Sequence, residues 1–303
     1  MIDRRYELRA REAWADLRVR AQRAGVHGSV AAPMPAGEPL AANCIVFSKD
    51  RAMQLEACLS SIARFAPYQG IPTVIFKASS SEFGAAYEQL EGSAVLVPEG
   101  SDFRGTLLEA IDASLPHTVF HTDDDVFFRR PASTPILPEG FAAFSLRLGE
   151  NTSYCYPLAS EQPMPRVECS GPLMAWDWRT AEGDFAYPMS LDGHLLSTAL
   201  VLRMLARARF KNPNELEEEL HLRRYLAPSG MLAFRQSCMV GIPANVVSSS
   251  HENRSAGRPE WSPSRLNARF LDGERIDLDA MDFSGVRGAH QEVEPMFTNV
   301  LDR

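Results

Sequence analysis

Four short apolar runs alternate with helix-forming segments between residues 43 and 130, and this alternation leaves few folds open to the chain. Each run is rich in β-branched and aromatic residues, as in a strand buried inside a parallel sheet. The expected strands are 43–47, 72–77, 94–97 and 118–120. The segments expected to be helical between them are 53–62, 83–90 and 103–114. This order predicts an α/β fold with a doubly wound, mainly parallel sheet flanked by helices.

The N-terminal segment is expected to add a helix over residues 2–24, followed by a Gly/Pro/Ala-rich linker over 25–40. The apolar stripe of this helix is Tyr6, Ala10, Trp14, Leu17 and Ala21. Its other face is rich in arginine. Such a basic amphipathic helix either packs on its own domain with a solvated face or contacts an anionic membrane surface.

The chain beyond Pro131 has a less regular pattern. The expected elements are a strand at 141–147, pocket-shaping loops at 149–190, a helix at 191–210, a helix capped by Asn212 that ends before Pro228, and a strand at 238–242. The tail from Leu266 onward has moderate helical character. We divide the chain into 1–40, a main domain at 41–255 with halves 41–130 and 131–255, and a C-terminal extension at 256–303.

Composition excludes several classes of protein. The 303 residues carry a formal net charge of -8, which argues against a nucleic-acid partner. The five cysteines are scattered without a C-x-x-C pair, so a reducing compartment is expected. No apolar stretch approaches the roughly 20 residues that span a bilayer, and no signal peptide is evident. These features favour a cytoplasmic protein.

Three adjacent carboxylates, Asp123 to Asp125, follow the fourth expected strand. Such a cluster between two apolar runs either is a solvated acidic turn or binds a hard cation such as Mg²⁺ or Mn²⁺. The polar turn 48–51 follows the first expected strand. Ligands of doubly wound sheets bind beyond the carboxyl ends of strands, where both segments should lie. Their shared position favours a ligand site.

Two segments in this order resemble glycosyltransferases of the GT-A fold. Ile45-Val-Phe-Ser-Lys-Asp-Arg-Ala-Met-Gln-Leu-Glu-Ala-Cys-Leu-Ser-Ser-Ile62 is similar to the opening of family 2 type enzymes, and Val119-Phe-His-Thr-Asp-Asp-Asp-Val-Phe127 resembles their Asp-x-Asp motif. The resemblance covers residues 43–130 most specifically, weakens to about 255, and is absent from both ends. It implies a Rossmann-like nucleotide-binding sheet and a nucleotide-sugar donor.

The resemblance also implies roles for individual residues. Asp123 and Asp125, with His251 or alternatively His290, would bind Mn²⁺ or Mg²⁺ on the donor diphosphate. The residues implied in nucleotide binding are Phe47, Ser48, Asp50, Arg51, Arg104 and Asp124. The segment 169–173 could be the glycine-containing loop that approaches the donor sugar, or an ordinary turn.

Asp192 stands where the family places an acidic pair whose acid is the base of inverting enzymes, although the neighbouring Glu is missing here. Its other interpretation is a helix N-cap. The leading hypothesis is a metal-dependent transferase that moves a sugar to a hydroxyl acceptor, either a glycan or a small molecule. An inverting route would use Asp192 as base, whereas a retaining route needs none. The alternatives are a sugar nucleotidyltransferase, against which the missing Gly-rich loop counts, and a non-catalytic glycan- or nucleotide-binding module.

Overall fold

A nine-stranded sheet with the order β3-β2-β1-β4-β11-β6-β12-β10-β9 forms the centre of the protein. The computed structural model describes residues 4–21, 38–247, 255 and 257–299. The strands of this sheet are β1 (Ala42–Lys49), β2 (Thr73–Lys77), β3 (Val95–Pro98), β4 (His117–Thr122), β6 (Phe141–Ser145), β9 (Glu168–Ser170), β10 (Leu173–Asp177), β11 (His194–Ser197) and β12 (Gly230–Phe234). Only β11 and β10 run opposite to the other strands of this sheet. The predicted α/β fold with a large, mainly parallel sheet is therefore confirmed.

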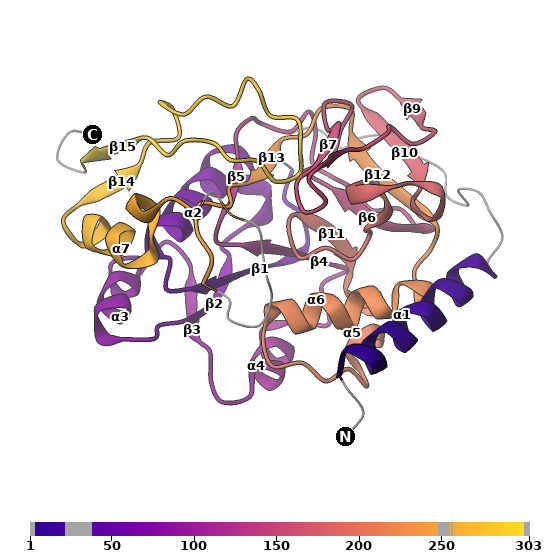
Figure 1. Ribbon diagram of the computed structural model, residues 1–303, viewed down its shortest axis with the longest axis horizontal. Coiled ribbons are helices and arrows are strands. Elements are labelled where there is room, and N and C mark those ends of the chain that lie inside the picture. The colour runs from indigo at the N-terminus through magenta and orange to yellow at the C-terminus, as the bar shows by residue number, and fades with distance from the viewer. Residues whose placement is uncertain (1–3, 22–37, 248–254, 256, 300–303) are drawn as a thin grey trace.

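Helices cover both faces of this sheet (Figure 1). The helices are α1 (Arg4–Arg20), α2 (Ala52–Phe65), α3 (Ser81–Glu88), α4 (Phe103–Ala110), α5 (Thr198–Leu205), α6 (Pro213–Leu222) and α7 (Pro263–Leu271). Successive side chains of β1 point to opposite faces. Val46 packs into a core with α2, α3 and α7, whereas Phe47 packs into a second core with α4, α5 and α6.

Shorter elements complete the chain. Short strands pair as β5 (Asp125–Phe127) with β13 (Met239–Gly241), β7 (Tyr154–Cys155) with β8 (Ser160–Glu161), and β14 (Glu274–Ile276) with β15 (Phe297–Asn299). The 3₁₀ turns are η1 (Pro67–Gln69), η2 (Trp178–Thr180), η3 (Gly183–Ala186), η4 (Arg224–Leu226) and η5 (Pro259–Trp261). Apolar side chains from α7 to Val293 share the core of α2 and β1, so this C-terminal segment packs on the main sheet.

The position of β1 in the sheet brings the two segments singled out in the sequence to one edge. β1 pairs in parallel with β2 on one side and with β4 on the other. In the register with β4, Phe47 is opposite Thr122. The turn that follows β1 and the aspartates that follow β4 therefore leave the sheet side by side.

The expected helix over 191–210 is wrong in its first part. Residues 194–197 form β11, which pairs antiparallel with both β4 and β6, and the helix begins only at Thr198. Ser197 caps this helix by accepting a hydrogen bond from the backbone N–H of Leu200. Asp192 is therefore not a helix N-cap, and that interpretation is excluded.

Other expected boundaries also change. The expected loop region 149–190 contains β10, a strand of the central sheet. Trp176 of β10 and Trp178, which begins η2, are both buried. β12 was not expected from the sequence. The segment 169–173 spans the turn between β9 and β10 at the outer edge of the sheet, which agrees with its interpretation as an ordinary turn. The Asn212 cap is confirmed, because its side chain accepts from the backbone N–H of Glu215.

Helix α1 buries a different stripe from the expected one. Ala15 and Val19 are buried where α1 packs against α6 and η4, whereas Trp14 and Leu17 are 47% and 66% exposed. Figure 1 shows α1 along the outside of α5 and α6. The expected linker lies outside the described residues except for its last three. Within the described part of the chain, no helix has the length and apolarity needed to cross a membrane.

Candidate functional site

Ser48, which still belongs to β1, and the turn that follows contact the first aspartate of the triplet directly. Ser48 Oγ donates to Asp123 Oδ2 over 2.8 Å, and Arg51 Nη1 donates to Asp123 Oδ1 over 2.8 Å. Tyr87 extends this chain, since its hydroxyl lies 2.7 Å from Ser48 Oγ. Ser48 and Asp123 are 75 positions apart in the sequence. The structure thus joins two of the predicted site segments at the carboxyl ends of adjacent parallel strands.

The backbone of Asp50 aims this turn. Its φ angle is 55°, in the left-handed region that non-glycine residues seldom adopt. The Asp50 side chain stabilises the turn, because its Oδ1 accepts from the backbone N–H of Ser79 over 2.7 Å. Asp50 is buried and bonds to the segment after β2. These bonds hold Arg51 over the aspartates, where its Nη1 also lies 3.4 Å from Asp124 Oδ2.

The acidic triplet is buried at both ends and partly open in the middle. The side chains of Asp123, Asp124 and Asp125 are 5%, 17% and 1% exposed. Burial raises the pKa of Asp123 to about 6, with Arg51 opposing the shift. Burial, followed by the charges of Asp192 and Asp124, raises the pKa of Asp125 well above its usual range. Arg51 therefore compensates only part of the negative charge that the three carboxylates carry when ionised.

Asp125 has one unused oxygen. Its Oδ2 accepts from the backbone N–H of Thr122 over 3.1 Å. Its Oδ1 is buried and accepts no hydrogen bond from any residue that the structure describes. A buried carboxylate oxygen without a donor is costly. A cation at this oxygen would remove that cost, and oxygen ligands suit Mg²⁺ or Mn²⁺.

The described residues do not enclose a metal ion by themselves. No group of three or more His, Cys, Asp or Glu side chains among the described residues is arranged as a complete metal site. This pattern fits a cation that takes only some of its ligands from the protein, as Mg²⁺ does when it binds substrate phosphates. The buried, unbonded Oδ1 of Asp125 is the feature of the described residues that fits such a cation.

Asp192 lies next to the triplet and accepts hydrogen bonds from three sides. Thr122 Oγ1 lies 3.1 Å from Asp192 Oδ1 and 2.8 Å from Asp124 Oδ1, so its proton links the two carboxylates. Arg147 Nη1 and His290 Nε2 lie 3.2 Å and 3.1 Å from Asp192 Oδ2. Burial opposes ionisation of Asp192, but His290 and Arg147 outweigh it and lower the pKa of this carboxyl.

Glu217 of α6 extends the same network. Its Oε1 accepts from Ser190 Oγ over 3.0 Å and from the backbone N–H of Leu191 over 3.1 Å. Ser190 Oγ also lies 3.4 Å from Asp192 Oδ2. Burial and the charge of Asp192 raise the pKa of Glu217 to about 7. The network thus contains one carboxyl group with a lowered pKa, Asp192, and one with a raised pKa, Glu217.

Two predicted nucleotide-binding residues have structural contacts instead of open faces. Phe47 is buried between aromatic rings, 5.7 Å from Phe120 and 5.8 Å from Phe103 between ring centroids. Arg104 donates to the backbone carbonyls of Leu205 and Ala208 at the end of α5. His251 lies outside the described residues. His290, its alternative, belongs to the Asp192 network.

Sequence reasoning missed Arg147 and Glu217 as site residues. Arg147 follows β6 and is 2% exposed, and burial of an arginine is rare without a carboxylate partner. Glu217 stands in the run Glu215-Leu-Glu-Glu-Glu219, where four acids offer no way to single one out. Only the fold shows which of them faces Ser190. The sequence around Arg147 has no motif that marks this arginine as a site residue.

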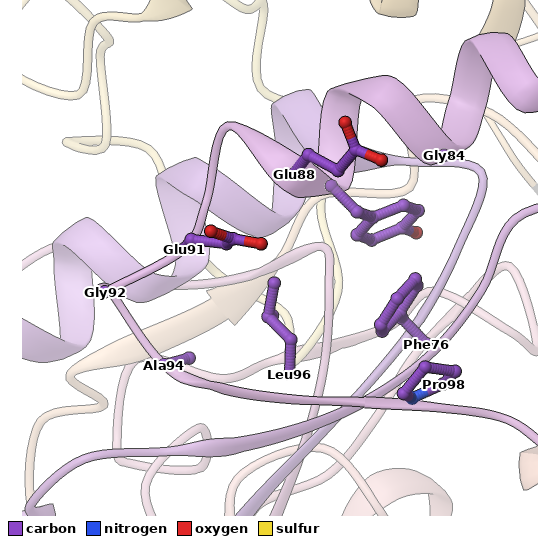
Figure 2. A pocket seen from close by; sticks show the side chains of 9 residues that line it. Phe76, Gly84, Glu88, Glu91, Gly92, Ala94, Leu96 and Pro98 are labelled. Atoms are coloured by element: carbon purple, nitrogen blue, oxygen red, sulfur yellow. The ribbon is translucent and has the colours of Figure 1, made fainter.

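A cavity of about 450 Å³ lies between α3 and the edge strand β3. Figure 2 shows the carboxylates of Glu88 and Glu91 on one side and Phe76, Leu96 and Pro98 on the other. Tyr87 lines the cavity and also bonds Ser48. None of the lining residues belongs to the acidic triplet. The cavity therefore adjoins the turn after β1 and does not contain the aspartates.

Comparisons with known proteins give only distant similarities. No protein-family model matches the sequence, and no curated protein matches it. A mannosyltransferase from Pyrobaculum calidifontis, solved with GDP-Man and Mn²⁺, is 14% identical with a TM-score of 0.30 over 73% of this chain and 80% of that chain. The mannosyltransferase Ktr4p from S. cerevisiae, solved with GDP, is 12% identical with a TM-score of 0.22 over 42% of this chain and 45% of that chain. Similarities this distant decide neither fold nor activity.

Proposed function

We propose that this protein is a metal-dependent glycosyltransferase that moves a sugar from a nucleotide-diphosphate sugar to a hydroxyl acceptor. One observation carries the proposal: Ser48 and Arg51 of the first strand's turn bond Asp123 at the edge where such sheets bind ligands. The sequence resemblance assigns these two segments to nucleotide and metal binding. Their direct contact is what that assignment requires.

The proposed cation is Mn²⁺ or Mg²⁺, held by Asp123 and Asp125 with His251. Asp125 is the stronger candidate ligand, because its Oδ1 is buried without a donor among the described residues. Asp123 already bonds Ser48 and Arg51, so it would hold the cation only while sharing its oxygens. The cation would neutralise charge on the departing diphosphate.

The proposed nucleotide site is the turn 48–51 together with Asp124. Arg51 faces the partly open middle of the triplet and would bind a phosphate oxygen there, as guanidinium groups do. Asp50 would act by holding the turn, since its carboxylate bonds Ser79. The contacts of Phe47 and Arg104 support structural roles, and their part in nucleotide binding stays a prediction.

Calorimetry tests the proposal directly. We expect UDP or GDP to bind only when Mn²⁺ or Mg²⁺ is present, and a screen of nucleotide sugars to show metal-dependent release of nucleoside diphosphate. Binding of neither nucleotide with either metal would overturn the proposal. Metal-independent binding of a glycan alone would instead identify a binding module.

A further inference from the structure

Asp192 is poorly suited to accept a proton, although its place in the sequence suggests that role. Its two oxygens accept hydrogen bonds from Thr122, Arg147 and His290. Two of these partners are cationic or titrate to a cation, and they stabilise the carboxylate. A proton added to Asp192 would remove the negative charge that Arg147 and His290 stabilise. The arrangement instead suits a permanent anion that orients Arg147 and His290.

Glu217 has the opposite arrangement. Both of its donors, Ser190 Oγ and the backbone N–H of Leu191, bind Oε1. Oε2 receives no hydrogen bond from the residues described, and the side chain is only partly buried. One oxygen is thus fixed by the protein and the other is left for an outside donor. A general base needs this combination of fixed orientation and a free lone pair.

The surroundings of Glu217 place it on the acceptor half of the chain. The ring of Tyr187 stacks on that of His221, with centroids 4.5 Å apart, and Tyr187 is only partly buried. Burial, followed by the charge of Glu217, raises the pKa of Tyr187 well above its usual range. Ser190 connects Glu217 to Asp192. Thr122 in turn connects Asp192 to Asp124 of the acidic triplet. Hydrogen bonds thus link Glu217 to the edge where the donor diphosphate is proposed to bind.

We propose that Glu217, and not Asp192, accepts the proton of the attacking acceptor hydroxyl, an inference that rests on the proposed glycosyltransferase function. The acceptor oxygen forms a bond to the anomeric carbon of the donor sugar. The bond from that carbon to the diphosphate oxygen breaks, and its electron pair leaves with the nucleoside diphosphate. The acceptor proton passes to Oε2 of Glu217. Asp192 stays ionised and positions Arg147 and His290.

Nucleoside diphosphate release from UDP-glucose and GDP-mannose, with water or added sugars as acceptor, tests this role in the full chain. Glu217→Gln keeps the size of the side chain and its bonds to Ser190 and Leu191. We expect turnover to fall by about 100-fold or more, the usual contribution of a general base. Binding of UDP or GDP with Mn²⁺ should stay within about twofold of the parent. Glu218→Gln, a change of the next carboxylate on α6, should keep parental turnover.

A second variant separates catalysis from structure. Glu217→Ala should be slow, and added formate should restore part of its turnover by accepting the proton in place of the missing carboxylate. The parent's rate should rise with pH through about 7, the pKa that burial and Asp192 give Glu217, with Arg147 opposing and Tyr187 facing it. This rise should vanish in Glu217→Gln.

Two outcomes would overturn the inference. One is turnover of Glu217→Gln within a few-fold of the parent. The other is a loss that formate does not restore and that leaves the shape of the pH profile unchanged, as a structural role would. Failure of the proposed function would look different, because the parent itself would then bind no nucleotide with Mn²⁺ and release none.

Discussion

His290 Nε2 lies 3.1 Å from Asp192 Oδ2, although the two residues are 98 positions apart in the sequence. The C-terminal segment reaches this position through its backbone. Gly241 of β13 donates to the carbonyl of Ala289 and accepts from the N–H of Gln291, which fixes the residue between them. The segment after residue 256 therefore supplies a side chain to the candidate site.

His290→Gln should change the pH dependence of stability. Burial lowers the pKa of His290, but its bond to Asp192 and the charge of Asp192 outweigh burial and raise it. A raised histidine pKa stabilises the folded state fully below the unfolded value of about 6.5, and this stabilisation fades as pH rises through the folded value. Urea denaturation from pH 5.5 to 9 should show the parent's advantage over the variant shrinking with pH. An advantage that is constant over this range would contradict the prediction.

Gly241→Ala should displace His290. A Cβ at this position would lie 2.5 Å from His290 Cδ2 and 3.4 Å from Asp125 Oδ1. Crowding of this kind costs about 1–3 kcal/mol of stability, and nucleotide release should fall with it. Gly285→Ala is the matched control in the same half of the chain, because its Cβ would meet nothing within 4 Å. Thermal unfolding and turnover of both variants check the prediction, which fails if the two variants behave alike.

Arg147→Met should destabilise the protein by about 3 kcal/mol, the typical cost of removing one partner of a buried ion pair. Arg147 is 2% exposed and its Nη1 lies 3.2 Å from Asp192 Oδ2. In the variant, the negative charge of Asp192 loses its arginine partner and keeps only His290. The double variant Arg147→Met/Asp192→Asn should recover about 1 kcal/mol or more, because the unpaired charge is then removed as well. Additive losses in urea denaturation would show that the pair is not coupled.

Asp125→Asn should abolish metal-dependent nucleotide binding without unfolding the protein. Asp125 is buried, and its pKa is raised by burial and by Asp192 and Asp124, so the ionised group opposes folding in metal-free protein at neutral pH. The amide removes that charge, and metal-free stability should be equal to or above the parent's. Calorimetry with GDP and Mn²⁺, and urea denaturation without metal, measure the two effects. The exposed Asp272→Asn serves as control. Parental nucleotide binding by Asp125→Asn would exclude Asp125 as a ligand.

For helix α1, contact with an anionic membrane surface is the alternative that the sequence left open beside packing on its own domain. Trp14 and Leu17 are exposed, and the guanidinium of Arg18 lies 4.3 Å from the centre of the Trp14 ring. An exposed aromatic side chain beside arginines suits the interface of an anionic bilayer. Vesicles containing phosphatidylserine should sediment the protein more than neutral phosphatidylcholine vesicles, and Trp14→Ser/Leu17→Ser should remove the difference. Equal sedimentation with both lipids would leave α1 as a structural helix.

The strands of the first half could be predicted because each is a continuous apolar run between polar segments. The meeting of Ser48 with Asp123 could also be predicted, since both follow parallel strands at one edge of the sheet. β11 could not, because only Ser197 and Thr198 separate its apolar residues from those of α5. Only its pairing with β4 and β6 decides where the strand ends, and pairing between residues that are far apart in the sequence leaves no local pattern.

The remaining errors have similar physical causes. In α1 the large apolar residues Trp14 and Leu17 suggested the buried stripe, but the small Ala15 allows closer packing of α1 against its neighbours and is the buried residue. Arg147 and Glu217 became site residues only because β6 and α6 converge on the loop that carries Ser190 and Asp192. That convergence is a property of the fold and not of any segment.

The continuous pairing of β1, β4, β11 and β6 limits how the molecule can move. These backbone hydrogen bonds connect the parts of the chain before and after residue 130 within one sheet. A hinge motion that separated the two parts would have to break the hydrogen bonds between strands. Solution scattering should therefore record the same overall dimensions with and without nucleotide.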